Sequence, residues 1–198
     1  MAWKLQLNNE IKAYFLEGRD DVRRMSLQHE VITKNMLSPN AKGLQVGVPS
    51  NTDKKISDKW IAIDLYDKRP CIDYNMDLCD LSFKDNMFDF ILCNAVLEHV
   101  KDPFKCASEM YRVTKPGGEI WVEVPFVQAY HPTKDYDENI HGIIDNREKD
   151  FNGDFNHGGD YWRFTPQGIV ELMKPFIMKD VLIAVCGGIA YYGVKNNG

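Results

Sequence analysis

The stretch that decides the fold lies in the middle of the chain, where residues 88–124 read FDFILCNAVLEHVKDPFKCASEMYRVTKPGGEIWVEV. Its two ends, residues 88–93 and 120–124, are short apolar runs, which are typical of strands buried on both faces of a parallel sheet. Between them, Asp102 can cap a helix that begins at Pro103, and the Lys-Pro-Gly-Gly that follows ends it. The stretch therefore predicts a strand, a helix and a second strand parallel to the first.

The pattern extends towards the N-terminus. Apolar residues recur at helical spacing over residues 9–37, and Pro39 cannot continue that helix. Two more short apolar runs, at residues 43–48 and 60–63, predict further buried strands. We therefore expect one or two N-terminal helices followed by a mostly parallel sheet.

The C-terminal part differs from the rest of the chain. Residues 130–163 are rich in Asp, His, Asn, Gly and Tyr and lack periodicity, which predicts a long irregular loop. Thr165 and Pro166 begin a short helix. Two apolar runs flank Gly187 and Gly188, which predicts an antiparallel hairpin closed by a two-residue turn.

Composition limits the class of protein. The chain has 198 residues, 24 basic and 29 acidic side chains and 44% hydrophobic residues, as one globular domain would. We expect a helical cap over residues 1–40 and an α/β core over residues 41–198. The net charge of −5 argues against a nucleic-acid partner, because phosphate binding depends on clustered Lys and Arg. No signal peptide or membrane span is evident, so we expect a cytoplasmic protein with no membrane partner.

Neither the cysteines nor the oxygen-rich segment at residues 150–156 indicates a cross-link or a metal site. The five cysteines are widely spaced and form no C-x-x-C pair, so neither a disulfide framework nor a zinc site is expected. Residues 150–156 place oxygen ligands on alternate positions but lack the glycine and the glutamate of a calcium loop. We therefore expect no metal.

Three linked motifs carry a family resemblance. They are DLCDLSF at residues 77–83, the strand and NAVLEHV that end at residue 100, and RVTKPGG at residues 112–118. In this order and spacing they resemble the class I S-adenosylmethionine-dependent methyltransferases, and residues 125–131 with 160–165 resemble a small bacterial subgroup of them. The resemblance implies a Rossmann-like α/β fold with a C-terminal antiparallel hairpin, and S-adenosylmethionine as the cofactor.

The resemblance assigns cofactor roles to two acidic residues. Asp64, at the end of residues 60–63, matches the acid that accepts hydrogen bonds from the ribose hydroxyls. Asp77 matches the acceptor for the adenine amine. Because Asp is common in turns, residue type alone would favour an ordinary turn aspartate at Asp64. The flanking motifs favour the binding role.

Three more residues lie beside these acids. Leu65, just after the ribose-binding acid, could supply one wall of the adenosine pocket. Leu78 matches the position whose backbone donates to the adenine ring. Plain packing explains either leucine equally well. Asn94 ends a strand at the edge where open α/β sheets bind ligands. A helix cap or turn residue is an equal alternative for Asn94.

The glycine loop departs from the family pattern. Where the family has an acid and a Gly-x-Gly-x-Gly loop, this chain has Gln45, and Gly47 is the only loop glycine left. Pro49 lacks the N–H that a second glycine would present. Only 16 residues separate Gly47 from Asp64, and 12 separate Asp64 from Asp77. The first two crossover helices should therefore be shortened or absent.

The candidates for acceptor chemistry come from the long loop. His131 can take a proton near neutral pH, and Asp160, Tyr161 and Arg163 lie in the motif before Thr165. A solvated polar cluster is an equal alternative for each of them. Arg163 beside aromatic residues suits an anionic or glycan-like acceptor.

Two functions remain in view. The first is methyl transfer to a small-molecule or glycan-like acceptor. The second is a degenerate methyltransferase fold that serves as a binding or assembly module, which the reduced glycine loop favours. A nicotinamide-dependent enzyme would need a G-x-G-x-x-G loop, and the chain has none.

Overall fold

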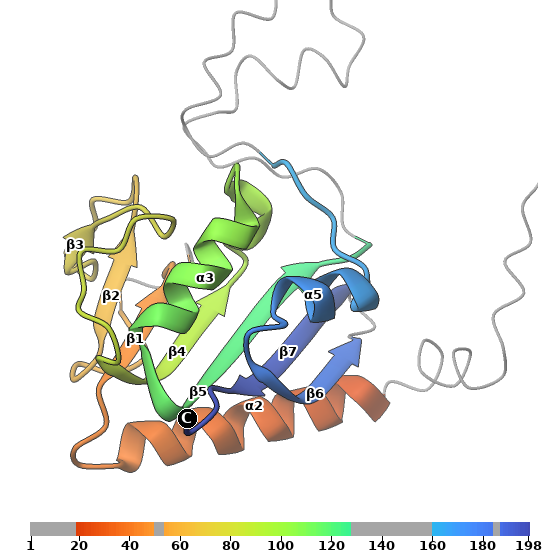
Figure 1. The fold of residues 1–198 in the computed structure, drawn as a ribbon, viewed down its shortest axis with the longest axis horizontal. Helices are drawn as coiled ribbons and strands as arrows, with labels where there is room; N and C mark the ends of the chain where they lie inside the picture. Colours follow the sequence, from red (N-terminus) through yellow and green to blue (C-terminus); the bar gives the residue numbers. More distant parts are fainter. Residues whose placement is uncertain (1–18, 50–53, 128–159, 184–186) are drawn as a thin grey trace, which may run out of the picture.

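A single sheet organises the molecule (Figure 1). The structure is a computed structural model that describes residues 19–49, 54–127, 160–183 and 187–198. The described residues form seven strands in the order β3-β2-β1-β4-β5-β7-β6. The first five are parallel, and β7 and β6 are antiparallel additions at one edge. The strands are β1 (Gly43–Val46), β2 (Ile61–Asp64), β3 (Tyr74–Asn75), β4 (Phe88–Asn94), β5 (Thr114–Pro125), β6 (Ile177–Ile183) and β7 (Gly188–Val194). The expected α/β class is confirmed.

The central strands are apolar throughout because helices cover both faces of the sheet. In β4, Phe90 and Leu92 pack in the cluster under α2 (Arg19–Leu37). Their neighbours Ile91 and Cys93 point to the opposite face and join the larger core cluster, which includes buried residues of α3 (Pro103–Val113) and α5 (Pro166–Leu172). This alternation explains why residues 88–93 show no polar face.

The helix α2 packs on one face of the sheet (Figure 1). Its residues Lys34 and Asn35 each donate a hydrogen bond to the Glu119 carboxylate of β5 at 2.8 Å, and the Tyr192 hydroxyl of β7 donates a third at 2.7 Å. Burial raises the pKa of Glu119, but these bonds outweigh it and lower the pKa overall. The remaining part of the predicted N-terminal helix lies outside the described residues.

The two helices on the other face begin as the sequence predicts. Asp102 caps α3 by accepting a bond from the Lys105 N–H at 2.9 Å, with Pro103 in the first turn. Thr165 caps α5 by accepting from the Gly168 N–H at 3.0 Å. No described helix combines the length and apolar character of a membrane span.

The expected loss of two crossover helices is confirmed in the described residues. Residues 54–60 and 65–73 contain only turns and bends. A polar network stands in their place, because Lys55 donates to Asp73 at 2.7 Å and to the Trp60 carbonyl at 2.8 Å. The same Asp73 carboxylate accepts from the Ala62 N–H at 2.7 Å. Side chains therefore tie these short connections to β2.

Two predictions are wrong. Ile183 pairs with Ile189 at the end of the β6–β7 ladder, so the connection is longer than a two-residue turn at Gly187 and Gly188. Cys79 and Cys106 form a disulfide that closes a separation of 27 residues, with a Cα–Cα distance of 4.2 Å. The expectation of no disulfide failed because three-dimensional proximity, and no local spacing pattern, brings these two cysteines together.

Candidate functional site

The candidate site lies where β2, β1 and β4 end. Val46 of β1 pairs with Ile63 on one side and Cys93 on the other. The next residue along β1, Gly47, therefore lies between Asp64 and Asn94. This is the carboxyl edge of the parallel strands, where open α/β sheets bind ligands.

The backbone at Gly47 requires a glycine. Its φ of +75° lies in the left-handed region, and a Cβ there would meet the Val96 side chain at 2.8 Å. Its N–H donates to the Ile63 carbonyl at 2.9 Å, which ties it to β2. A side chain at this position would therefore clash with Val96 in a backbone conformation that favours glycine.

Asp64 is oriented by the turn that follows it. Its Oδ1 accepts from the N–H groups of Tyr66 and Asp67, both at 2.9 Å. Its carbonyl accepts from the Asn75 side chain at 3.1 Å. These contacts fix the carboxylate at the sheet edge through Oδ1. Leu65, the predicted wall, keeps 42% of its surface exposed at this edge.

Asp77 lies in a turn of its own after β3. Its Oδ1 accepts from the Cys79 N–H at 2.8 Å, and its carbonyl accepts from the Asp80 N–H at 3.0 Å. The Leu78 side chain is only 4% exposed and packs in the core. Core packing, the alternative weighed for Leu78, therefore accounts for its side chain.

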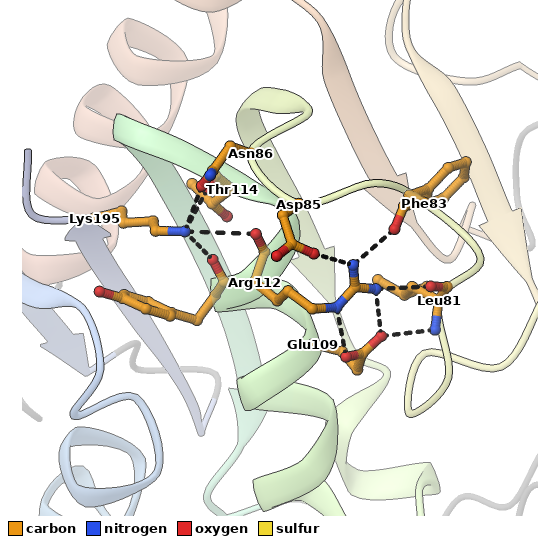
Figure 2. A network of polar contacts seen from close by, with 9 residues as sticks. Leu81, Phe83, Asp85, Asn86, Glu109, Arg112, Thr114 and Lys195 are labelled. Atoms are coloured by element: carbon orange, nitrogen blue, oxygen red, sulfur yellow. Dashed lines mark hydrogen bonds and ion pairs between the residues drawn. The ribbon is translucent and has the colours of Figure 1, made fainter.

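Arg112 holds the loop that carries Asp77 (Figure 2). Its guanidinium donates to the Leu81 and Phe83 carbonyls, both at 2.7 Å, and to Asp85 at 2.8 Å. Glu109, one turn earlier in α3, accepts from Arg112 and from the Leu81 N–H. Hydrogen bonds from Arg112 lower the pKa of Glu109 despite its partial burial. The loop after Asp77 is thus fixed to α3 by charge-assisted bonds.

Lys195 completes the network on the other side of α3 (Figure 2). Its ammonium donates at 2.8 Å to the Asn86 side chain and to the carbonyls of Tyr111 and Thr114. The chain after β7 therefore closes against the junction between α3 and β5.

A cavity of about 190 Å³ opens beside Gly47, between α2 and the ends of β1 and β4. Its described lining residues are Gln28, Ile32, Gln45, Gly47, Pro49, Lys54, Ile56, Leu92 and Asn94. Asn94 thus contributes to the cavity wall, and Ala95 after it takes a left-handed φ of +52°. Such backbone strain clusters at functional sites.

Gln45 fixes the loop in place of the family's acid. Its side-chain amide donates to the Gly47 carbonyl at 3.2 Å, and its Oε1 accepts from the Ile56 N–H at 2.8 Å. A carboxamide can both donate and accept in this way, whereas an ionised carboxylate only accepts. Arg69 also donates to the Val48 carbonyl at 2.7 Å and the Pro49 carbonyl at 3.1 Å. Side chains therefore hold the loop that a helix would otherwise continue.

Of the three predicted catalytic residues, the structure describes two, Asp160 and Arg163. Asp160 and Arg163 form an ion pair with each other, and the Asp160 side chain is fully buried. The hydrogen bonds that Arg163 donates to Asp160 raise the pKa of Arg163. His131 lies outside the described residues. The pairing of Asp160 with Arg163 fits an anchoring role for this segment.

Glu98 is the charged residue that sequence reasoning passed over. It lies in η1 (Leu97–His99), just after β4, and is fully buried. Its carbonyl accepts from the Tyr161 N–H at 2.7 Å, which joins η1 to the segment carrying Asp160. Burial raises the pKa of Glu98 to about 7; Asp160 also raises it, and Arg163 opposes the shift. In the sequence, the feature that could have identified Glu98 is an acidic residue shortly after the buried strand that ends at Asn94.

We expect Glu98 to make stability depend on pH. Because the folded pKa of about 7 lies above the ordinary 4.5, the folded state holds the proton more tightly, so stability falls as pH rises from about 4.5 to 7. At 1.36 kcal/mol per pKa unit, the upper limit of the loss is about 3 kcal/mol. Urea titrations of the protein and of Glu98→Gln across this range measure the difference. The variant should lose less stability with rising pH, and parallel curves would contradict the expectation.

The comparisons with known proteins agree with this geometry. The family described as a methyltransferase domain matches residues 54–122. An uncharacterized protein of Methanocaldococcus jannaschii is 31% identical over 110 residues, 49% of this chain and 54% of that protein. The ubiquinone/menaquinone biosynthesis C-methyltransferase UbiE of Bdellovibrio bacteriovorus is 30% identical over 126 residues, 58% of this chain and 52% of that protein. The chain thus spans about half the length of these two relatives.

Solved structures share the fold across nearly the whole chain. A methyltransferase of Methanosarcina mazei gives a TM-score of 0.53 at 21% identity, covering 84% of this chain and 98% of that one. Residues 54–122 thus resemble a methyltransferase domain, and the fold is that of S-adenosylmethionine-dependent methyltransferases. The fold alone does not set the reaction, because the [4+2]-cyclase SpnF shares it with a TM-score of 0.58 at 14% identity over 89% of this chain and 83% of its own. In this chain the reaction must be argued from the site.

Proposed function

We propose that the chain binds S-adenosylmethionine and transfers its methyl group to a small-molecule or glycan-like acceptor. One observation carries the proposal: the Asp64 carboxylate and Asn94 flank Gly47 at the carboxyl edge of the parallel strands, where open α/β sheets bind ligands. In the proposed complex, Asp64 accepts hydrogen bonds from the two ribose hydroxyls. Asp77 accepts from the adenine amine, and Leu65 covers one face of the base.

The residues present fit the adenosine half of the cofactor. Asp64 uses Oδ1 for the turn amides, and we assign Oδ2 to the ribose hydroxyls. The Asp77 turn is fixed by Arg112 and by the disulfide at Cys79, which preorganises it for the base. Both acids lie on connections that are tied down by side chains, and a preorganised site binds with less loss of entropy.

For methyl transfer the protein mainly has to align the acceptor with the methyl group. The bound cofactor supplies a methyl carbon that its sulfonium already activates. The residues at the ends of β4 and β5 must orient the acceptor in line with that carbon and exclude water. A hydroxyl or protonated amine acceptor would also need a base. His131 is the candidate for that base, because Glu98 is fully buried and offers no surface to an acceptor.

The acceptor class is argued from the segment beside Glu98. Trp162 is 40% exposed, and its indole N–H donates to the Val100 carbonyl at 2.8 Å, which fixes the ring. A fixed aromatic face packs well against the apolar face of a sugar or a flat small molecule. Arg163 is engaged by Asp160, so an anionic acceptor receives less support than the sequence suggested.

Isothermal titration with S-adenosylhomocysteine tests the proposal. Asp64→Asn keeps an oxygen for the Tyr66 and Asp67 amides but removes the charge, so we expect affinity to fall by about tenfold, the loss of one charge-assisted bond. Asp58→Asn is the matched control, because Asp58 is exposed and precedes β2 at the opposite edge of the sheet. Equal affinities for the two variants would contradict the role of Asp64.

The second candidate is a fold that binds no cofactor and acts as a binding or assembly module. The loop after β1 favours it, because Pro49 offers no N–H and the Gln45 amide is committed to Gly47 and Ile56. No heat of binding with millimolar S-adenosylhomocysteine, from protein that unfolds cooperatively, would favour this module over the enzyme.

A further inference from the structure

The turn that carries Asp77 is joined to α3 by the disulfide as well as through Arg112. Arg112 donates to the Leu81 carbonyl, which follows the turn, at 2.7 Å. Within the turn, the hydrogen bonds from the Cys79 and Asp80 N–H groups go to Asp77 itself, so they shape the turn without attaching it to another element. The disulfide from Cys79 therefore attaches the turn to α3 at a point that Arg112 does not hold.

The two cysteines of this bridge differ in their access to solvent. Cys106 is fully buried in the N-terminal part of α3. Cys79 is only partly buried, and its Sγ lies 3.3 Å from the carbonyl oxygen of Asp102, an exposed residue just before that helix. A thiolate in solution attacks a disulfide at a sulfur that it can reach. The attack should therefore occur at Cys79 and not at Cys106.

We propose that Cys79 is a redox-modification site for a small thiol of the glutathione class. The attacking thiolate forms a new S–S bond to Cys79 Sγ, and the bond between Cys79 and Cys106 breaks. The electron pair of that bond stays on Cys106 Sγ, which takes up a proton. A second small thiol then attacks the mixed disulfide, leaves Cys79 as a thiol and departs joined to the first as a disulfide. The two electrons that the protein gains come from these two small thiols.

The modification acts on one end of the proposed nucleoside site. This consequence rests on the proposed function, in which Asp77 accepts from the adenine amine. The buried Leu78 side chain still anchors the turn in the core, so loss of the bridge should loosen the turn without unfolding it. Asp64 is held separately, by the Tyr66 and Asp67 N–H groups. Reduction should therefore weaken recognition of the adenine amine and leave the ribose contacts unchanged.

Two single variants test the position of the modification. Cys106→Ser leaves Cys79 as a partly exposed thiol, and Cys79→Ser leaves Cys106 as a buried one. Each variant, shown to be folded by thermal unfolding, is incubated with oxidised glutathione, and peptide mapping locates the adduct. We expect the adduct on Cys79 to form at least about tenfold faster than the adduct on Cys106, because a buried sulfur reacts slowly. Equal rates, or a faster reaction at Cys106, would show that the site is wrong.

Titration of the oxidised and the reduced protein with two ligands tests the consequence for binding. S-adenosylhomocysteine carries the adenine amine, and S-inosylhomocysteine has a carbonyl oxygen in its place. We expect the oxidised protein to prefer S-adenosylhomocysteine by about tenfold and the reduced protein by about threefold or less. The control is the double variant Cys79→Ser with Cys106→Ser, whose preference should equal that of the reduced protein with and without reductant.

The outcomes separate this inference from the proposed function. If the oxidised protein binds neither ligand, the proposed function is wrong, while the adduct on Cys79 still decides whether the modification site is right. If it binds both and reduction leaves the preference unchanged, or lowers both affinities equally, the link between the bridge and adenine recognition is wrong and the proposed function stands. A preference that falls on reduction and returns on reoxidation supports the inference.

Discussion

Reduction of the disulfide between Cys79 and Cys106 is expected to lower the free energy of unfolding by roughly 3 to 4 kcal/mol. The bridge closes a separation of 27 residues, and the chain-entropy relation assigns a loop of that size about this stabilisation. It also joins the turn of Asp77 to the first turns of α3. Reduction should therefore loosen the loop that carries Asp77, the acid proposed to bind adenine, as well as destabilise the fold.

Urea titrations with and without dithiothreitol measure this effect. The control is the double variant Cys79→Ser with Cys106→Ser, whose stability should not respond to the reductant. Thiol titration in denaturant should count two fewer thiols before reduction than after it. Cys71 and Cys93 are free and buried, so neither explains such a difference. Identical unfolding curves in both conditions would contradict the expectation.

Replacement of Gly47 by alanine should abolish cofactor binding. The new Cβ would lie 2.8 Å from the Val96 side chain, in a backbone conformation that only glycine adopts readily. It would also occupy the space between Asp64 and Asn94, over which the ligand must pass. We expect affinity for S-adenosylhomocysteine to fall by about a hundredfold or more, since both reorientation of the loop and blockage contribute.

Gly117→Ala is the matched control for backbone strain. Gly117 has a φ of +73°, and a Cβ there would meet only the flexible Asn197 side chain, at 2.6 Å. It lies at the start of β5, away from the carboxyl edge. The two variants should lose similar stability, measured by thermal unfolding, but only Gly47→Ala should lose binding. Full affinity in Gly47→Ala would remove Gly47 from the site.

The fold could be predicted where burial leaves a pattern in consecutive residues of the sequence. The runs at residues 43–48 and 88–93 are apolar on both faces because the sheet is covered on both sides, and that pattern is local. The missing crossovers followed from residue counts between Gly47, Asp64 and Asp77. No comparable local pattern predicts the disulfide, because Cys79 and Cys106 come together only when α3 has packed on the sheet.

The site was predictable only in part for the same reason. Asp64 and Asn94 end strands, and strand ends converge at one edge by topology alone. Glu98 required knowledge of a contact with Tyr161, which lies far away in the sequence. The commitment of the Gln45 amide to Ile56, and the position of Lys54 at the cavity, likewise depend on how the short connection after β1 folds back.

The docking of α2 has a consequence for the order of folding. This helix lies near the beginning of the chain, yet Val31 and Ile32 pack in one cluster with Leu182 of β6 and Ala190 of β7. During synthesis the helix emerges long before its partners, and such long-range contacts fold late. Because Gln28 and Ile32 of the same helix form one wall of the cavity, this wall gains its full set of packing partners only when β6 and β7 are in place. A nascent chain that lacks β7 should therefore hold the cavity wall less firmly than the full chain does.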